Sequence, residues 1–159
     1  MAQTRTIELS ANGLVHHIEV HDRMTLADAL RELCGLTSIN LGCEHGVCGS
    51  CTVLINGKPV RSCLMFAVQA EKKEIQTAEG LATGTGELHP LQEAFHEHHG
   101  LQCGFCTPGF LMLAAGYLEE NPHATEVELR EVLSSNLCRC TGYKNIVNAV
   151  VSAADQMRV

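Results

Sequence analysis

Eight of the nine cysteines in this 159-residue chain fall into two groups, and their spacing restricts the fold more than any other sequence feature. In the first group, Cys43, Cys48 and Cys51 follow a C-x4-C-x2-C pattern, and a fourth cysteine, Cys63, comes after eleven intervening residues. Thiolates at this spacing are typical of a plant-type [2Fe–2S] loop. Glycines within the loop allow the backbone to bring N–H groups close to sulfur atoms. We therefore predict an iron–sulfur electron-transfer site in the first half of the chain.

The second half of the chain carries four further cysteines, which form two close pairs. Cys103 and Cys106 make a C-x2-C pair, Cys138 and Cys140 make a C-x-C pair, and 31 residues separate the pairs. Each pair follows the end of a predicted helix and precedes the start of another, so helix packing can bring the pairs together. Four cysteines can also bind one zinc ion in a tetrahedral site. The spacing alone leaves both possibilities open, and the iron–sulfur loop in the same chain favours a second cluster.

The composition argues against several classes of function. The formal net charge of -7, the absence of tryptophan and the lack of a lysine or arginine cluster argue against nucleic-acid binding. No apolar run approaches the roughly 18 residues that a membrane span needs. The first residues contain neither an apolar signal segment nor a twin arginine, so we expect a cytoplasmic protein. In that reducing compartment, cysteines act as metal ligands or free thiols more often than they form disulfides.

The pattern of residues 1–77 predicts a small α+β domain. Asn12-Gly13 and Asn56-Gly57 indicate hairpin turns. Thr25 is the predicted N-cap of a helix whose apolar residues continue at helical spacing to Leu33. The strands are predicted over Thr4–Ser10, Val15–Val20, Thr52–Ile55, Lys58–Arg61 and Lys73–Thr77. Two hairpins, one helix and a final strand predict a plant-ferredoxin-like β-grasp fold.

The second half changes to helical periodicity. Residues 78–88 are rich in glycine and threonine and have no clear period, which predicts a linker. Helices are then predicted over His89–His99, Pro108–Glu120, Thr125–Ser134 and Tyr143–Met157. Four short helices predict a four-helix bundle over residues 89–159. The sequence thus predicts an N-terminal ferredoxin-like domain and a C-terminal helical domain, each with one cysteine group.

Three segments that contain the cysteines resemble the motifs of a known family. They are Gly42–Thr52, Gln102–Gly109 and Asn136–Tyr143. Together they look like the motifs of the small, two-cluster subunit of the molybdenum hydroxylases, the xanthine oxidase family. Multi-subunit bacterial members include carbon monoxide dehydrogenase, quinoline oxidoreductase and nicotine dehydrogenase. The resemblance covers most of the chain, and Ser50 stands where many relatives have alanine, a change between two small residues.

The resemblance implies two sets of iron ligands. In the family, the ferredoxin-like domain holds one [2Fe–2S] cluster and the helical domain holds another. Carried onto this sequence, the ligands of the first cluster are Cys43, Cys48, Cys51 and Cys63. The ligands of the second cluster are Cys103, Cys106, Cys138 and Cys140. Gln102 and Cys140 correspond to positions close to the molybdopterin of a partner subunit.

The resemblance also implies partners and a direction for electrons. Substrate would be oxidised at molybdenum in a large subunit, whose molybdopterin would be of the cytosine dinucleotide type, with water as the oxygen source. A medium subunit would carry FAD, and the complex would be a heterotrimer or a dimer of heterotrimers. Electrons would pass through the helical-domain cluster and then the ferredoxin-like cluster to the flavin. The chain would belong to an oxidoreductase, but it would itself be an electron carrier with no catalytic residue and no substrate site.

Other interpretations remain for the cysteine groups. A free-standing two-cluster ferredoxin would use the same ligands without partner subunits, and a zinc-stabilised interaction module would contain no iron. His45 and Cys43 resemble half of a Rieske site, but no second histidine follows Cys63. Cys103 and Cys106 lack the βαβ context of a redox dithiol. A solvated helix face is expected for His96, His98 and His99.

Cys34 has no partner at ligand spacing, so we predict that it is a buried thiol that behaves as an apolar side chain. The Cys34→Ser variant should therefore retain about four irons per chain, two from each cluster. Iron analysis of the purified protein measures this, and Cys51→Ser is the matched change that should reduce the iron content. Loss of half the iron from Cys34→Ser would show that the ligand assignment is wrong.

Overall fold

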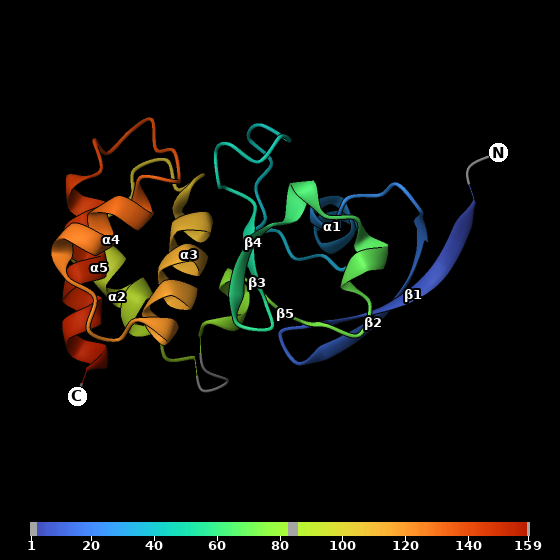
Figure 1. Ribbon diagram of the computed structural model, residues 1–159, viewed down its shortest axis with the longest axis horizontal. Coiled ribbons are helices and arrows are strands. Elements are labelled where there is room, and N and C mark those ends of the chain that lie inside the picture. The colour runs from blue at the N-terminus through green and yellow to red at the C-terminus, as the bar shows by residue number, and fades with distance from the viewer. Residues whose placement is uncertain (1–2, 83–85, 159) are drawn as a thin grey trace.

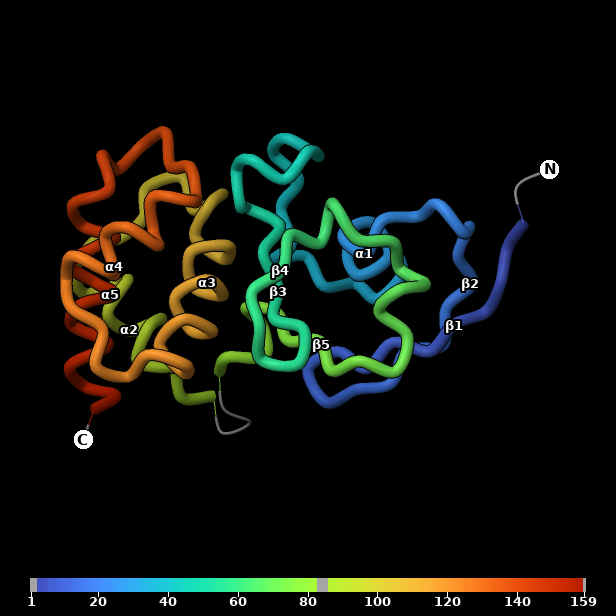
Figure 2. Tube along the Cα trace, viewed as in Figure 1, coloured from blue at the N-terminus to red at the C-terminus, as the bar shows by residue number. Residues whose placement is uncertain are grey.

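The structure is a computed structural model that describes residues 3–82 and 86–158. It has a part built on a β-sheet and a helical part, which lie side by side along the long axis (Figure 1). The first hairpin and the last helix, α5, lie at opposite ends of that axis (Figure 2). The order of the parts along the chain is the predicted one, a sheet followed by helices.

The sheet has five strands in the order β2-β1-β5-β3-β4. Strands β1 and β2, β3 and β4, and β3 and β5 are antiparallel, whereas β1 and β5 are parallel, so the sheet is mixed. The strands are β1 (Thr4–Ala11), β2 (Leu14–His21), β3 (Thr52–Ile55), β4 (Lys58–Arg61) and β5 (Glu74–Gln76). All five predicted strands are confirmed, and their ends shift by no more than one residue.

Both hairpins turn at the predicted Asn-Gly pairs. Asn12 and Gly13 have φ values of 52 and 77, and Asn56 and Gly57 have φ values of 51 and 79. Two successive residues with positive φ are what a type I′ turn requires, and such a turn matches the twist of the flanking strands. The local sequence therefore sets the pairing register of β1 with β2 and of β3 with β4.

A short helix packs against the sheet. The Thr25 hydroxyl accepts a 3.1 Å hydrogen bond from the Asp28 N–H, which confirms the predicted N-cap of α1 (Leu26–Asp28). The helix then widens to a π-helical turn, η1 (Ala29–Leu33), where the sequence predicted one regular helix. Apolar periodicity does not distinguish these helix types, because both bury the same face. The first core includes the buried side chains of Ile7, Leu9, Leu26, Leu30 and Val53.

The helical part contains α2 (Pro90–Glu97), α3 (Thr107–Glu120), α4 (Glu126–Leu133) and α5 (Lys144–Met157). The four predicted helices are therefore confirmed within two residues at each end. The predicted capping box between Thr125 and Glu128 also forms, with both reciprocal hydrogen bonds. The second core includes Phe95, Phe110, Met112, Leu129 and Ile146, all at most 1% exposed. Among the described residues, no helix is both long and apolar enough to cross a membrane.

Some structure was not predicted from the sequence. Short 3-10 turns occupy Ser62–Leu64, Ala67–Ala70 and Ala78–Gly80. The last of these lies in the segment 78–88, which was expected to be a linker, and both Ala78 and Leu81 are buried in the core of the helical part. Residues 83–85 of that segment lie outside the described residues.

Helix α3 approaches the sheet closely at Gly116. A Cβ atom at this position would lie 2.7 Å from Leu54 Cδ2 and 2.8 Å from Pro59 Cγ and Cδ. Leu54 belongs to β3 and Pro59 to β4, so the absence of a side chain at Gly116 allows the two parts of the molecule to pack directly. Through this contact, α3 packs directly against β3 and β4.

Gly116→Ala should therefore destabilise the protein although alanine is the better helix former. The helix preference favours alanine by about 1 kcal/mol, but overpacking against the rigid Pro59 ring costs about 1–3 kcal/mol. We expect the free energy of unfolding to fall by about 1 kcal/mol on balance. Far-UV circular dichroism during denaturation measures this, with Glu119→Ala on the same helix as the control. Equal or greater stability of Gly116→Ala would contradict the packing argument.

Candidate metal centres

Three cysteines of the first group lie on the loop between η1 and β3, and the fourth, Cys63, lies in the 3-10 turn Ser62–Leu64 after β4. Glu44, Gly46 and Gly49 have φ values of 57, 82 and 75, so the chain reverses repeatedly through left-handed conformations. A Cβ atom at Gly46 would lie 2.4 Å from Leu64 Cδ1, so glycine is needed where Leu64 covers the loop. The result is a loop that curls around its own cysteines and presents backbone N–H groups inward.

Two sulfurs of this loop lie close together near its outer end. The Cys48 N–H points at Cys43 Sγ at 3.3 Å. This hydrogen bond is the main cause that lowers the pKa of the Cys43 thiol to about 6, because it stabilises the thiolate. The backbone therefore favours the charge that a metal ligand carries.

The other two sulfurs of the group lie inside the sheet domain. Cys51 is 2% exposed and Cys63 is 7% exposed, and they flank the hairpin of β3 and β4. Ser62 ties the two ends together, because its hydroxyl donates a 2.6 Å hydrogen bond to the Cys51 carbonyl. Burial raises the pKa of the Cys63 thiol to about 11, and the neighbouring Cys51 adds to the increase. A bound cation would offset this cost, since a coordinated thiol is deprotonated.

The second cysteine group is assembled from two turns of the helical part. Cys103 and Cys106 precede α3, whereas Cys138 and Cys140 precede α5, and Cys140 Sγ lies 3.5 Å from Cys103 Sγ. Burial, together with the adjacent Cys138 thiol, raises the pKa of Cys106 to about 12. The two pairs, which are separated by 31 residues in sequence, therefore meet as predicted.

The turn after the second pair supports it with hydrogen bonds. Thr141 donates to Cys138 Sγ from its N–H at 3.4 Å and from its hydroxyl at 3.1 Å. Burial would raise the pKa of Cys138, but these hydrogen bonds outweigh it and lower the pKa. The Tyr143 hydroxyl accepts a 3.0 Å hydrogen bond from the Cys138 N–H, and its ring packs edge-on against Phe110. Thr141 and Tyr143 follow the cysteine pair directly, but spacing alone did not show these roles.

The two groups differ in their exposure to solvent. Cys103, Cys140 and Gln102 are exposed, whereas Cys106 and Cys138 are half-buried beside the helical core. One side of the second group therefore faces the surface, and the other side faces the interior. In the first group, Cys51 and Cys63 are buried and the other two are half-buried.

The two groups lie next to one another, and the loops that carry them lie along the same long side of the molecule, the upper side in Figure 1. A cavity of about 430 Å³ lies between them, and its lining includes Cys48 and Ser50 from the first loop and all four cysteines of the second group. Phe105 also lines this cavity, and a Cβ atom at Gly42 would lie 3.3 Å from its ring. The predicted sites are thus two neighbouring sites in one structural unit.

The loops are also joined by direct hydrogen bonds. The Leu137 N–H donates to the Cys48 carbonyl at 2.9 Å. The Asn40 side chain, just before the first loop, donates to the Phe105 carbonyl at 2.8 Å. Phe105 lies between Cys103 and Cys106, so each turn of the second group contacts the first domain. Sequence reasoning missed these contacts, because no local pattern relates the residues.

The sulfurs gather as close pairs. In the part of the chain that the structure describes, no three or more histidine, cysteine, aspartate or glutamate side chains are arranged to hold one metal ion. A mononuclear zinc site needs four ligands around one ion, whereas a [2Fe–2S] cluster distributes four cysteines over two irons. Four cysteines that lie as two close pairs are the donor set that a [2Fe–2S] cluster uses, and each group provides this set.

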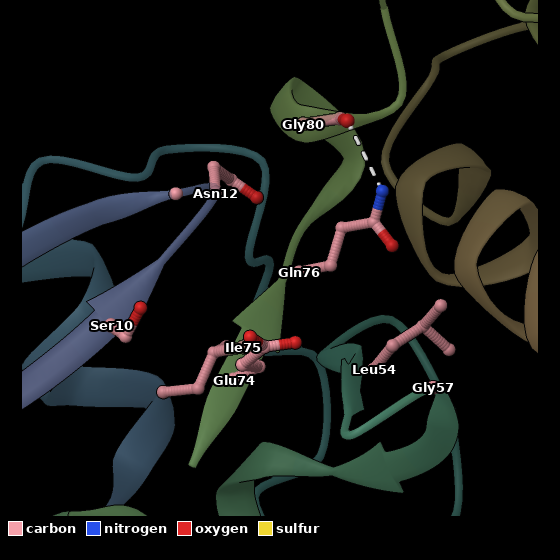
Figure 3. Close-up of a pocket in the computed structure, with 9 residues that line it drawn as sticks. Ser10, Asn12, Leu54, Gly57, Glu74, Ile75, Gln76 and Gly80 are labelled. Atoms are coloured by element: carbon pink, nitrogen blue, oxygen red, sulfur yellow. Dashed lines mark hydrogen bonds between the residues drawn. The ribbon is translucent and has the colours of Figure 1, made fainter. Parts of the chain in front are cut away.

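A separate cavity of about 290 Å³ lies between β1, β5 and the turn Ala78–Gly80 (Figure 3). Its lining includes no cysteine, and its one ionisable side chain is Glu74. Gln76 spans one side of it and donates a 3.1 Å hydrogen bond to the Gly80 carbonyl. This hydrogen bond joins β5 to the turn that leads to the helical part, so we interpret the cavity as structural.

Several other candidates lie outside the two groups. Cys34, predicted to be buried, is half-buried: it packs against the edge of the first core, and this partial burial raises the pKa of its thiol. His45 Nδ1 lies against the carbonyl of Cys43, so the ring contacts the backbone of the loop. Of the histidines on the α2 side, His96 and His99 are exposed and His98 is partly exposed.

Comparison with known proteins matches two iron–sulfur family models along the chain. Residues 9–82 match the model of the 2Fe-2S iron-sulfur cluster binding domain, and residues 77–151 match that of the [2Fe-2S] binding domain. The nicotine 6-hydroxylase small subunit of Paenarthrobacter nicotinovorans is 55% identical, over 95% of this chain and 90% of that protein. Caffeine dehydrogenase subunit gamma of Pseudomonas sp. (strain CBB1) is 52% identical, over 95% and 92%.

A solved structure agrees with these relatives. A chain of quinoline 2-oxidoreductase from Pseudomonas putida 86 superposes with a TM-score of 0.93 at 52% identity, and the match covers 99% of this chain and 98% of that chain. The fold, the two matched domains and the relatives all point to one family, in agreement with the resemblance of the cysteine motifs. This chain belongs to the small, two-cluster iron–sulfur subunits of the molybdenum hydroxylase family.

Proposed function

We propose that this chain is the electron-transfer subunit of a molybdenum hydroxylase complex, and that it carries electrons from a molybdopterin-containing large subunit to a flavin subunit. The observation that supports this most strongly is the adjacency of two four-cysteine groups, whose loops are hydrogen-bonded to one another. A [2Fe–2S] cluster supplies one-electron redox chemistry when it is bound. Two such sites in series suit a hydroxylation, which releases two electrons that must leave one at a time.

We assign each close pair of cysteine sulfurs to one iron atom of a cluster. In the first domain, Cys43 and Cys48 would hold one iron, while the buried pair Cys51 and Cys63 would hold the other. In the helical part, the exposed pair Cys103 and Cys140 would share one iron. The half-buried pair Cys106 and Cys138 would then share the second iron. The assignment is supported by the proximity of the sulfurs within each pair and by the N–H groups directed at Cys43 and Cys138.

The exposure of the second group supports a direction for the electrons. Gln102, Cys103 and Cys140 are exposed, so a partner can approach this side of the second cluster closely. We assign Gln102 and Cys140 to the contact with the molybdopterin, expected to be of the cytosine dinucleotide type. The first cluster, on the far side of the Leu137–Cys48 hydrogen bond, would then deliver electrons to FAD in a medium subunit.

We also propose a division of the chain into domains. We divide it into a ferredoxin-like domain (1–77), a linker (78–88) and a helical domain (89–159) that forms a four-helix bundle. The contacts of α2 with α5 and of α3 and α4 with their neighbours support the bundle. We place the complex in the cytoplasm, as a heterotrimer or a dimer of heterotrimers, because iron–sulfur ligation needs reduced thiols.

EPR of the reduced protein tests the two-cluster proposal. The native chain should give two distinct S = 1/2 signals. Cys63→Ser should alter the signal of the first cluster alone, and Cys106→Ser should alter that of the second alone, because each removes a ligand of one cluster. Cys34→Ser serves as the control that changes neither signal. A single signal in the native protein, or a stoichiometric zinc content without iron, would contradict the proposal.

Size-exclusion chromatography of the native protein separates the proposal from a free-standing ferredoxin. The chain expressed with its neighbouring large and medium subunits should elute with them as one complex. Elution of the cluster-loaded chain as a monomer, in the presence of both subunits, would instead support the independent carrier.

A further inference from the structure

Three consecutive residues between α4 and the last cysteine pair bind the sheet domain. Arg61 of β4 donates a 3.0 Å hydrogen bond to the Ser135 carbonyl. The Asn136 side-chain N–H2 donates to the Gly49 carbonyl at 3.3 Å. The Leu137 N–H donates to the Cys48 carbonyl at 2.9 Å. We call these three hydrogen bonds the interloop contact.

Asn136 lies at the centre of the interloop contact and is 1% exposed. A Cβ atom at Gly49 would lie 2.1 Å from Asn136 Oδ1, so the side chain fits directly on the glycine backbone. A Cβ atom at Gly109, at the start of α3, would lie 2.2 Å from the Gly49 carbonyl oxygen. Gly49 is therefore held between Asn136 on one side and α3 on the other, with no room for a side chain.

An apolar side chain of similar size could fill the space that Asn136 occupies, so its polar amide group needs a separate explanation. Its Oδ1 atom is buried and has no hydrogen-bond partner, which carries a free-energy penalty. A leucine of similar volume would avoid that penalty. What leucine lacks is the N–H2 donor that reaches the Gly49 carbonyl, which also accepts a hydrogen bond from the Thr52 N–H at 3.2 Å. The property that asparagine has and leucine lacks at this position is thus the hydrogen bond from Asn136 to the Gly49 carbonyl, which joins the two loops.

We propose that Asn136 is a positioning residue for electron transfer between the two clusters. By fixing Gly49, it holds the Cys48 carbonyl against the Leu137 N–H, and Leu137 is bonded directly to Cys138. Cys48 and Cys138 are then connected by one hydrogen bond and a few covalent bonds. With both clusters bound, one electron would pass from the reduced second cluster to the oxidised first cluster. No bond is broken and no proton is required.

This inference depends on the proposed function, because it needs both clusters. Its test uses the full-length chain in the complex, with both clusters bound. Asn136→Leu and Asn136→Asp each remove the N–H2 donor, the first as an apolar and the second as an isosteric change. Asn145→Leu is the matched control, because the Asn145 amide donates to the His99 carbonyl within the helical part, away from the interloop contact.

The measurements are the iron content, the two EPR signals and the dipolar coupling between the two reduced clusters. We expect both Asn136 variants to keep about four irons per chain and both signals, with a weaker dipolar coupling and a slower electron exchange between the clusters. Asn145→Leu should match the native protein in every measurement.

Native dipolar coupling and exchange in both Asn136 variants, at full iron content, would overturn the proposal. Loss of iron from both variants would also overturn it, because Asn136 would then be required for folding or cluster binding and not for setting the distance between the two clusters. Failure of the proposed function would appear separately, as a native protein that lacks two EPR signals.

Discussion

The structure depends on what offsets the free-energy cost of placing four cysteine thiolates close together. Thiolates repel one another, and burial disfavours their charge. The raised pKa values of Cys63 and Cys106 show this cost where sulfurs are most buried or paired. The positive charge of bound iron removes it, so the free energy of metal binding contributes to folding. Each half of the chain is small, a size at which bound metal often supplies the stability that a small core lacks.

The remaining architecture brings two such groups together. The hairpin of β3 and β4 brings Cys51 and Cys63 to one end of the sheet, and helix packing brings together two turns that are distant in sequence. Gly116 lets α3 lie directly against the sheet, and Gly49 and Gly109 let the cysteine loops approach without an intervening side chain. The adjacency of the two metal centres therefore follows from close backbone packing at a few glycines.

Local signals in the sequence predict much of this fold. The turns at Asn12-Gly13 and Asn56-Gly57 and the capping box at Thr125 were predictable, because the residues that determine them are neighbours in the chain. The spacing of the cysteines indicated the first loop and the two close pairs of the second group for the same reason, whereas the meeting of those pairs depends on helix packing. The domain division and the individual iron ligands remain proposals, which the proximity of the sulfurs supports.

Features that depend on tertiary contacts were not predictable. The pairing of β5 with β1, the π-helical turn after α1 and the burial of Leu81 in the helical core have no local signature. The interloop contact is of the same kind, since Asn136 and Gly49 are separated by 87 positions. Either residue alone is an ordinary loop residue, and their significance appears only when the two loops are seen together.

Anomalous X-ray scattering from crystals of the purified, cluster-loaded protein is the most direct test of the central claim. At the iron absorption edge, the account predicts two pairs of iron atoms. One pair should lie among Cys43, Cys48, Cys51 and Cys63, and the other among Cys103, Cys106, Cys138 and Cys140. A single metal atom in either group, a signal at the zinc edge, or iron bound elsewhere would contradict it.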